Sequence, residues 1–167
     1  MADSPDAEYL RFHRAEHAAV VAFLRYLGFA HHIADESASE ALVELYWSWA
    51  EVRTNRRMWV RTTARRIAGK KISRTSTLKR LLERGLRPVE GRIDPVIEEL
   101  LERNSDLVQA INSLPRHQRE VIALRLDDFS TAEIAVELNI AERTVQDRAK
   151  KAGDAISSML ATGEETR

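Results

Sequence analysis

The sequence predicts an all-α protein built of two small helical domains and a linker. Only 6 Gly and 4 Pro occur among its 167 residues, too few to form the turns that a protein of many strands needs. Apolar residues recur at spacings of three and four along most of the chain, which is the periodicity of amphipathic helices. A chain of this length suits one ordinary domain or two small ones.

Composition excludes several classes of protein. With 44% hydrophobic and 31% charged residues, the chain is globular rather than disordered. The absence of cysteine excludes disulfides, a thiol nucleophile and a zinc site built on thiolates. The most apolar stretch, residues 18–30, is interrupted by Arg25 and is too short to span a membrane, and the N-terminus is acidic where a signal peptide is basic. We therefore expect a cytoplasmic protein.

The first predicted domain, residues 1–74, holds three helices. Their expected ranges are 8–28, 34–50 and 58–73, with the adjacent pair His31-His32 in a loop. Arg61, Arg65 and Arg66 are expected to project off the buried face of the third helix. The expected inward-facing residues are Phe12, Ala15, Ala19, Phe23 and Tyr26 in the first helix, Ala41, Leu42, Leu45, Tyr46 and Trp49 in the second, and Val60, Thr63, Ala64 and Ile67 in the third.

Residues 75–104 are predicted to be the linker, because they hold four of the chain's ten Gly and Pro residues. Helical pieces are expected at 78–84 and 96–103. The second predicted domain, residues 105–167, is more regular. Pro115 is expected to open a helix, and Ser130-Thr131-Ala132-Glu133 is a capping box. The final helix carries an apolar stripe at Val145, Ala149, Ala152, Ile156 and Met159.

Two short helices separated by the turn Asn139-Ile140-Ala141 predict a helix-turn-helix. The first helix would brace the second by burying Ile134, Ala135 and Val145, which leaves the second free to lie in a DNA major groove. The alternative is a plain helical hairpin with a solvated polar face. Arg, Gln and Lys are the side chains that read base edges and reach phosphates. The expected contact residues are Arg143, Thr144, Gln146, Arg148, Lys150 and Lys151.

Although the net charge is zero, basic and acidic residues are unevenly distributed along the chain. Residues 1–74 hold 12 basic and 9 acidic residues, whereas residues 105–167 hold 8 basic and 11 acidic ones. Between Arg53 and Arg74 there are nine Lys or Arg residues and no acid. We call this run the basic strip. It is either a solvated face or, because it also carries Trp59 and an apolar stripe, a folded surface for nucleic acid.

No catalytic constellation is visible. Asp35, Glu36, Glu40 and Glu44 lie on one helix, where exposed carboxylates are usually solvated, and no His is expected at metal-ligand spacing to them. The sequence has no Gly-rich phosphate loop and no Ser-His-Asp arrangement. We therefore expect neither an enzyme nor a bound metal or cofactor.

Three motifs in the last third resemble region 4 of the extracytoplasmic-function sigma factors of bacteria. They are Leu114-Pro115-Arg116-His117-Gln118-Arg119-Glu120-Val121, Ser130-Thr131-Ala132-Glu133-Ile134-Ala135 and Arg143-Thr144-Val145-Gln146-Asp147-Arg148. In the first domain, Ala34-Asp35-Glu36 with Glu40 and Leu45-Tyr46-Trp47, and Trp59-Val60 with Ala64-Arg65, resemble region 2 of the same family. The resemblance covers about residues 9–160.

This resemblance implies partners and roles. Asp35, Glu36, Glu40 and Glu44 would dock on core RNA polymerase. Asn55, Trp59, Arg61 and Arg65 would handle the −10 strand, although a Trp at a helix start is more often part of a core. Arg143, Thr144, Gln146, Arg148, Lys150 and Lys151 would handle the −35 duplex. An anti-sigma factor is a further implied partner.

The chain also departs from the family pattern. Ser39 stands where the family usually has Gln, Arg66 and Lys70 where it commonly has Asn and Asp, and Arg143 and Asp147 where Gly and Ser are frequent. Two other functions remain open at this point. One is a conventional DNA-binding regulator that uses only the helix-turn-helix, and the other is a degenerate sigma factor that acts only as a protein-interaction module.

Overall fold

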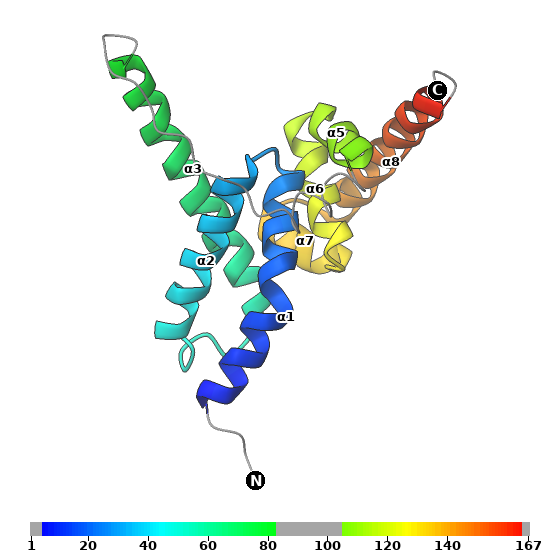
Figure 1. Cartoon of the computed structure of the whole chain (residues 1–167). Coiled ribbons are helices and arrows are strands. Elements are labelled where there is room, and N and C mark those ends of the chain that lie inside the picture. Colours follow the sequence, from blue (N-terminus) through cyan, green and yellow to red (C-terminus); the bar gives the residue numbers. More distant parts are fainter. Residues whose placement is uncertain (1–4, 83–104, 165–167) are drawn as a thin grey trace. The chain divides into compact units, whose positions relative to one another are not determined.

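The computed structural model describes residues 5–82 and 105–164, and within these ranges all regular elements are helices (Figure 1). The helices group into two compact units. Of the described residues, the first contains 5–24 and 29–82, and the second contains 25–28 and 105–164. The predicted all-α fold with two helical parts is therefore confirmed for the described residues. Among the described residues, none of the helices has the length and hydrophobicity of a membrane-spanning segment.

Three helices form the first unit: α1 (Pro5–Tyr26), α2 (His31–Trp47) and α3 (Arg56–Leu82). The helix α3 begins two residues earlier than predicted and continues through the first part of the predicted linker. The predicted helical piece at 96–103 lies outside the described residues. His31 and His32 form the first turn of α2, so their predicted placement in a loop is wrong.

The core of the first unit combines confirmed and corrected positions. In α3, Val60, Thr63, Ala64 and Ile67 are all buried as predicted. In α2, Ala41, Leu42, Leu45 and also Trp49 just beyond it are buried, but Tyr46 is 39% exposed. The stripe predicted for α1 is mostly wrong, since Phe23 alone of its five members is buried. The residues that α1 buries are Tyr9, Val20, Val21, Phe23 and Leu24.

Tyr9 shows why the predicted α1 stripe is misplaced. Its hydroxyl donates a hydrogen bond of 2.9 Å to the carbonyl of Leu42, and its ring lies edge-on to those of Tyr46 and Trp49. The aromatic contacts turn α1 about its axis relative to the face that periodicity selects. Where alanines are frequent, as at Ala15, Ala18, Ala19 and Ala22, several faces of the helix are similarly apolar. Periodicity then does not show which face is buried.

Four helices form the second unit: α5 (Ser105–Ser113), α6 (Arg116–Leu126), α7 (Thr131–Leu138) and α8 (Glu142–Glu164). Pro115 directly precedes α6 as predicted. The core contains Ile111, Leu114, Val121 and Leu124 from α5, α6 and their connection. The α8 stripe ends early, because Met159 is 41% exposed.

Candidate nucleic-acid and protein interfaces

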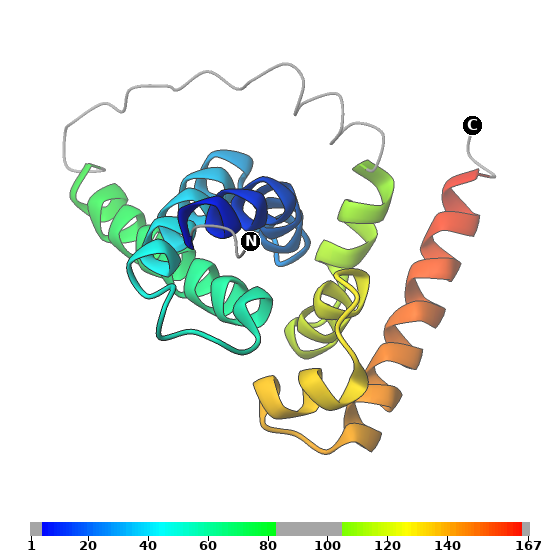
Figure 2. The same cartoon turned by 90° about the horizontal axis from the view of Figure 1, so that it is seen from below.

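The helix-turn-helix of the second unit is fixed at both ends of α7. The hydroxyl of Ser130 accepts a hydrogen bond of 3.2 Å from the backbone N–H of Glu133, and the carboxylate of Glu133 accepts one of 2.8 Å from the N–H of Ser130. The predicted capping box is thus confirmed. At the other end Asn139 adopts the left-handed conformation, with φ of 51° and ψ of 52°, which reverses the chain toward α8. Figure 2 shows α7 and the start of α8 on either side of this turn.

Packing leaves the start of α8 open to solvent on one face. Ile134 and Val145 are fully buried and Ala135 is nearly so, which confirms the predicted bracing of α8 by α7. The predicted contact residues lie on the remaining surface. Of these, Arg143, Gln146, Lys150 and Lys151 are exposed, and Thr144 and Arg148 are half-buried. Within the described part of the chain, none of the four cations forms an ion pair, so all are available to phosphates or bases.

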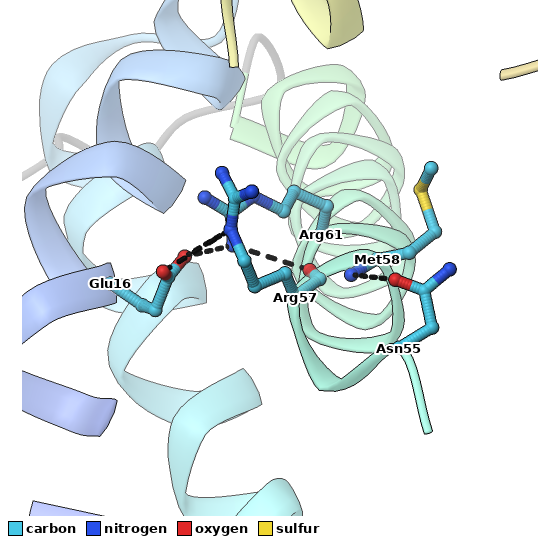
Figure 3. Close-up of polar contacts among 5 residues, drawn as sticks. All are labelled: Glu16, Asn55, Arg57, Met58 and Arg61. Atoms are coloured by element: carbon cyan, nitrogen blue, oxygen red, sulfur yellow. Dashed lines mark hydrogen bonds and ion pairs between the residues drawn. The ribbon is translucent and has the colours of Figure 1, made fainter. Parts of the chain in front are cut away.

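In the first unit Arg61 is not on the surface. Its side chain is 0% exposed and pairs with the carboxylate of Glu16 on α1, as Figure 3 shows. The neighbouring Arg57 reaches the same carboxylate, with Nε 3.2 Å from Oε1, and the carbonyl of Arg57 accepts a hydrogen bond of 3.2 Å from Arg61. The predicted projection of Arg61 into solvent is therefore wrong. Arg61 holds α3 to α1 and cannot reach a DNA strand from this position.

Asn55, Trp59 and Arg65 remain as the predicted strand-binding residues. Asn55 is exposed, with φ of 51°, and its side-chain oxygen accepts a hydrogen bond of 3.4 Å from the N–H of Met58 (Figure 3). Trp59 is half-buried rather than a core residue, and it lies in the first turn of α3 next to Asn55. Arg65 is also half-buried. The structure therefore brings Asn55 and Trp59 together at the start of α3.

The basic strip is largely neutralised by acids of α1 and α2. At least five of its nine cations form ion pairs: Arg56 with Glu8, Arg57 and Arg61 with Glu16, Arg66 with Glu44, and Lys71 with Glu36 and Glu40. The strip's own sequence contains no acid, so the partners come from distant positions. Sequence reasoning had no signal for these pairs, and the unit offers a much smaller free positive charge than its strip suggests.

The predicted acidic face of α2 is exposed but paired. Glu36, Glu40 and Glu44 are each engaged by a cation of α3, and Asp35 lies 3.6 Å from His17 of α1. The hydrogen bond from Lys71, together with the charge of its ammonium, lowers the pKa of Glu36 below its usual value. The carboxylate therefore stays ionised at neutral pH. The approach of His17 to Asp35 was not expected, but no cluster of three metal ligands occurs among the described residues.

An apolar patch on α1 and α2 was missed. Its members are Leu10, Val43 and Trp47, which are 51%, 53% and 79% exposed. They line a hollow of about 360 Å³ together with Asp6, Tyr9 and Tyr46. Val43 and Trp47 each follow an acid of α2, Glu36 and Glu40, by seven residues, so acids and apolar residues share one helix face. That spacing is the signal that sequence analysis could have used. Exposed apolar patches rimmed by polar groups mark surfaces that bind other proteins.

Comparison with known families decides the identity of the second unit. The family model for sigma-70, region 4 matches residues 105–152, which span α5, α6, α7 and the start of α8. The second unit is therefore similar to region 4 of sigma-70 factors. The exposed start of α8 lies within this match, and the predicted resemblance to a sigma factor is confirmed. No curated protein sequence matches the chain.

Two solved structures share the fold of region 4 and of the first unit. One is the sigma factor RpoE in complex with the anti-sigma factor NepR from Bartonella quintana, at 20% identity and a TM-score of 0.65, covering 92% of this chain and 97% of that one. The other is CnrH in complex with the cytosolic domain of CnrY, at 18% identity and a TM-score of 0.61, covering 94% and 90%. At these identities the likeness concerns the fold, and it extends the match beyond region 4 to a region 2-like first unit.

Proposed function

We propose that this sigma factor binds core RNA polymerase and directs it to particular promoters, with region 4 on the −35 element and the region 2-like unit on the −10 element. The observation that carries the proposal is the region 4 match over the start of α8. Its four cations form no ion pair among the described residues, and all of them except the half-buried Arg148 are exposed. The protein acts by binding and not by catalysis, and its place of action is the cytoplasm, with the polymerase. The proposed domains are residues 1–74 and 105–167, with 75–104 as linker, of which residues 75–82 continue α3.

Polymerase docking is assigned to the exposed face of α2. This face carries Glu36 and Glu40 next to Val43 and Trp47, so it offers charge for orientation and apolar area for affinity. Asp35 and Glu44 lie at its margins. Strand capture at the −10 element is assigned to Asn55, Trp59 and Arg65, because opened DNA exposes base faces that stack on aromatic rings.

Regulation by an anti-sigma factor is part of the proposal. Both related structures are complexes, one with the anti-sigma factor NepR and one with the cytosolic domain of CnrY. An inhibitor that covers the α2 face or the recognition helix would block either polymerase or DNA. The apolar patch of Leu10, Val43 and Trp47 gives such a protein a surface to bind.

Polymerase dependence of DNA binding distinguishes this function from a conventional regulator. Residues 105–167 carry more acidic than basic residues, and Asp147 lies within the recognition helix, so counterion release on duplex DNA is small. We expect weak binding of labelled promoter duplex by the free protein at physiological salt, and tight, specific binding with core polymerase. Fluorescence anisotropy with and without core, followed by run-off transcription, tests this. Tight sequence-specific binding by the free protein would support the conventional regulator, and polymerase binding without promoter-specific transcripts would support the interaction module.

Base reading at the −35 element is expected to depend on Arg143 and Arg148. Loss of a bidentate base contact costs about 1–3 kcal/mol and relaxes preference at one base pair, whereas loss of a phosphate contact weakens all sequences alike. Selection among −35 variants with Arg143→Ala and Arg148→Ala holoenzymes separates the two roles. Val136→Ala is the control, since Val136 is 83% exposed on α7 and outside the proposed contact set. Unchanged output from every promoter with both arginine variants would contradict the placement of the recognition helix.

A further inference from the structure

Ion pairs join the acidic face of α2 to the basic strip on α3. The ammonium of Lys71 lies 2.8 Å from a carboxylate oxygen of Glu36 and 2.7 Å from one of Glu40, and the guanidinium of Arg66 lies 2.7 Å from one of Glu44. We call these five residues the α2–α3 ladder. The ladder connects two surfaces that have different partners in the proposed function. The acids of α2 bind polymerase, and the basic strip contributes residues that bind DNA.

Two further cations lie beside the ladder without an ion pair. Lys70 and Arg74 are exposed, and neither has an ionic partner among the described residues. With Arg66 they are spaced by four residues along α3, so about 6 Å of helix axis separates each from the next. Phosphates of one DNA strand recur about every 3.4 Å along the duplex axis and also wind around it, so neighbouring phosphates lie farther apart than this axial step. A row of cations about 6 Å apart suits contact with neighbouring phosphates of one strand.

The ladder is weak enough to exchange partners. Its three carboxylates are 47–59% exposed and the Arg66 side chain is 48% exposed, whereas the Lys71 side chain is 21% exposed. An ion pair whose carboxylate is this open to water contributes little to stability. A partner that presents several cations to α2 can therefore replace Lys71 and Arg66 at little cost. A cation held by a carboxylate, by contrast, adds little to binding of phosphate, because the carboxylate repels the strand.

We infer that the α2–α3 ladder restrains DNA binding in the free protein and is released by polymerase. When polymerase occupies the α2 carboxylates, Arg66 and Lys71 become available and join Lys70 and Arg74 in a phosphate-binding surface for duplex DNA. Docking of one partner thereby strengthens binding of the other, with no change of fold. The inference rests on the proposed function for the identity of the partner on α2.

The first test needs the free protein alone. Glu44→Gln removes the carboxylate that holds Arg66, and Glu51→Gln is the matched control, because Glu51 is exposed near the end of α2 and has no ion pair among the described residues. With a labelled duplex, the salt slope of Glu44→Gln should steepen by about 0.9, which is about a 3.5-fold larger loss of affinity between 50 and 200 mM salt. Glu51→Gln should keep the wild-type slope, and Arg66→Gln combined with Glu44→Gln should abolish the gain.

The second test compares Arg66→Gln in the free protein and in the holoenzyme. In the free protein its slope on duplex DNA should equal that of wild type, because Glu44 already engages the cation. At saturating core polymerase its slope on promoter DNA should fall by about 0.9.

Either of two results would overturn the inference: equal slopes for Glu44→Gln and Glu51→Gln, or equal losses from Arg66→Gln in both states. Both leave the proposed function intact. Absence of polymerase-dependent transcripts from the wild-type protein would instead contradict the proposed function. The comparison of Glu44→Gln with Glu51→Gln would still test whether Glu44 restrains DNA binding, because it uses the free protein.

Discussion

Replacing Glu16 by alanine is expected to lower the free energy of unfolding of the first unit by about 3–5 kcal/mol, the usual effect of breaking a buried ion pair from one side. The carboxylate of Glu16 faces Arg61, whose side chain is fully buried, and it also engages Arg57. Its removal takes a carboxylate away from the buried guanidinium. Denaturant unfolding followed by tryptophan fluorescence measures the change, because Trp47, Trp49 and Trp59 all lie in the first unit.

Glu51→Ala is the control for this measurement, since an exposed surface change usually alters stability by no more than about 0.5 kcal/mol. Arg61→Ala should behave like Glu16→Ala, with loss of polymerase binding and of strand opening together as the unit unfolds. A fully folded Arg61→Ala protein with a defect limited to strand opening would contradict the structural role and restore Arg61 as a DNA contact.

Truncation of Trp47 should have the largest effect on polymerase binding. Replacement of a central aromatic anchor by alanine typically lowers the binding free energy of a protein interface by about 2 kcal/mol or more. This is roughly a 30-fold loss of affinity. In the free protein Trp47 is 79% exposed, so Trp47→Ala should change the free energy of unfolding by less than about 0.5 kcal/mol. Titration of labelled core polymerase measures the affinity.

Ile72→Ala provides the matched comparison, because Ile72 is 45% exposed on α3 of the same unit and outside the apolar patch. It should bind core polymerase like wild type. If Trp47→Ala also does so, polymerase docks elsewhere, and the patch of Leu10, Val43 and Trp47 is left to the inhibitory partner.

Local signals were sufficient to predict the second unit. The capping box at Ser130, the turn at Asn139 and the buried positions Ile134 and Val145 all lie between residues 130 and 145. Their energetics are those of helix ends and of one amphipathic face, which a sequence displays directly. Placing the recognition helix therefore requires no knowledge of contacts between distant residues.

The first unit depended on contacts between distant residues, and prediction was poorer there. Arg61 was expected on the surface because arginine is rarely buried, and its burial depends on Glu16, 45 positions earlier. Val43 and Trp47 lay outside the predicted core stripe of α2, and their joining with Leu10 of α1 into one exposed patch depends on how α1 packs. Only the packing of α1, set by Tyr9, decides which apolar residues of α2 stay outside.

The left-handed backbone at Asn55 has a consequence for how the start of α3 tolerates sequence change. Glycine, asparagine and aspartate accept a φ of 51° far more readily than other residues, and the asparagine side chain here also supplies an oxygen to the N–H of Met58. An alanine scan would therefore confuse backbone strain with loss of a base contact at this position. Glycine keeps the backbone permissible while removing the side chain, so Asn55→Gly is the more informative replacement. Because of this backbone constraint, we expect only a very small set of amino acids to be tolerated at position 55, whatever promoter the protein recognises.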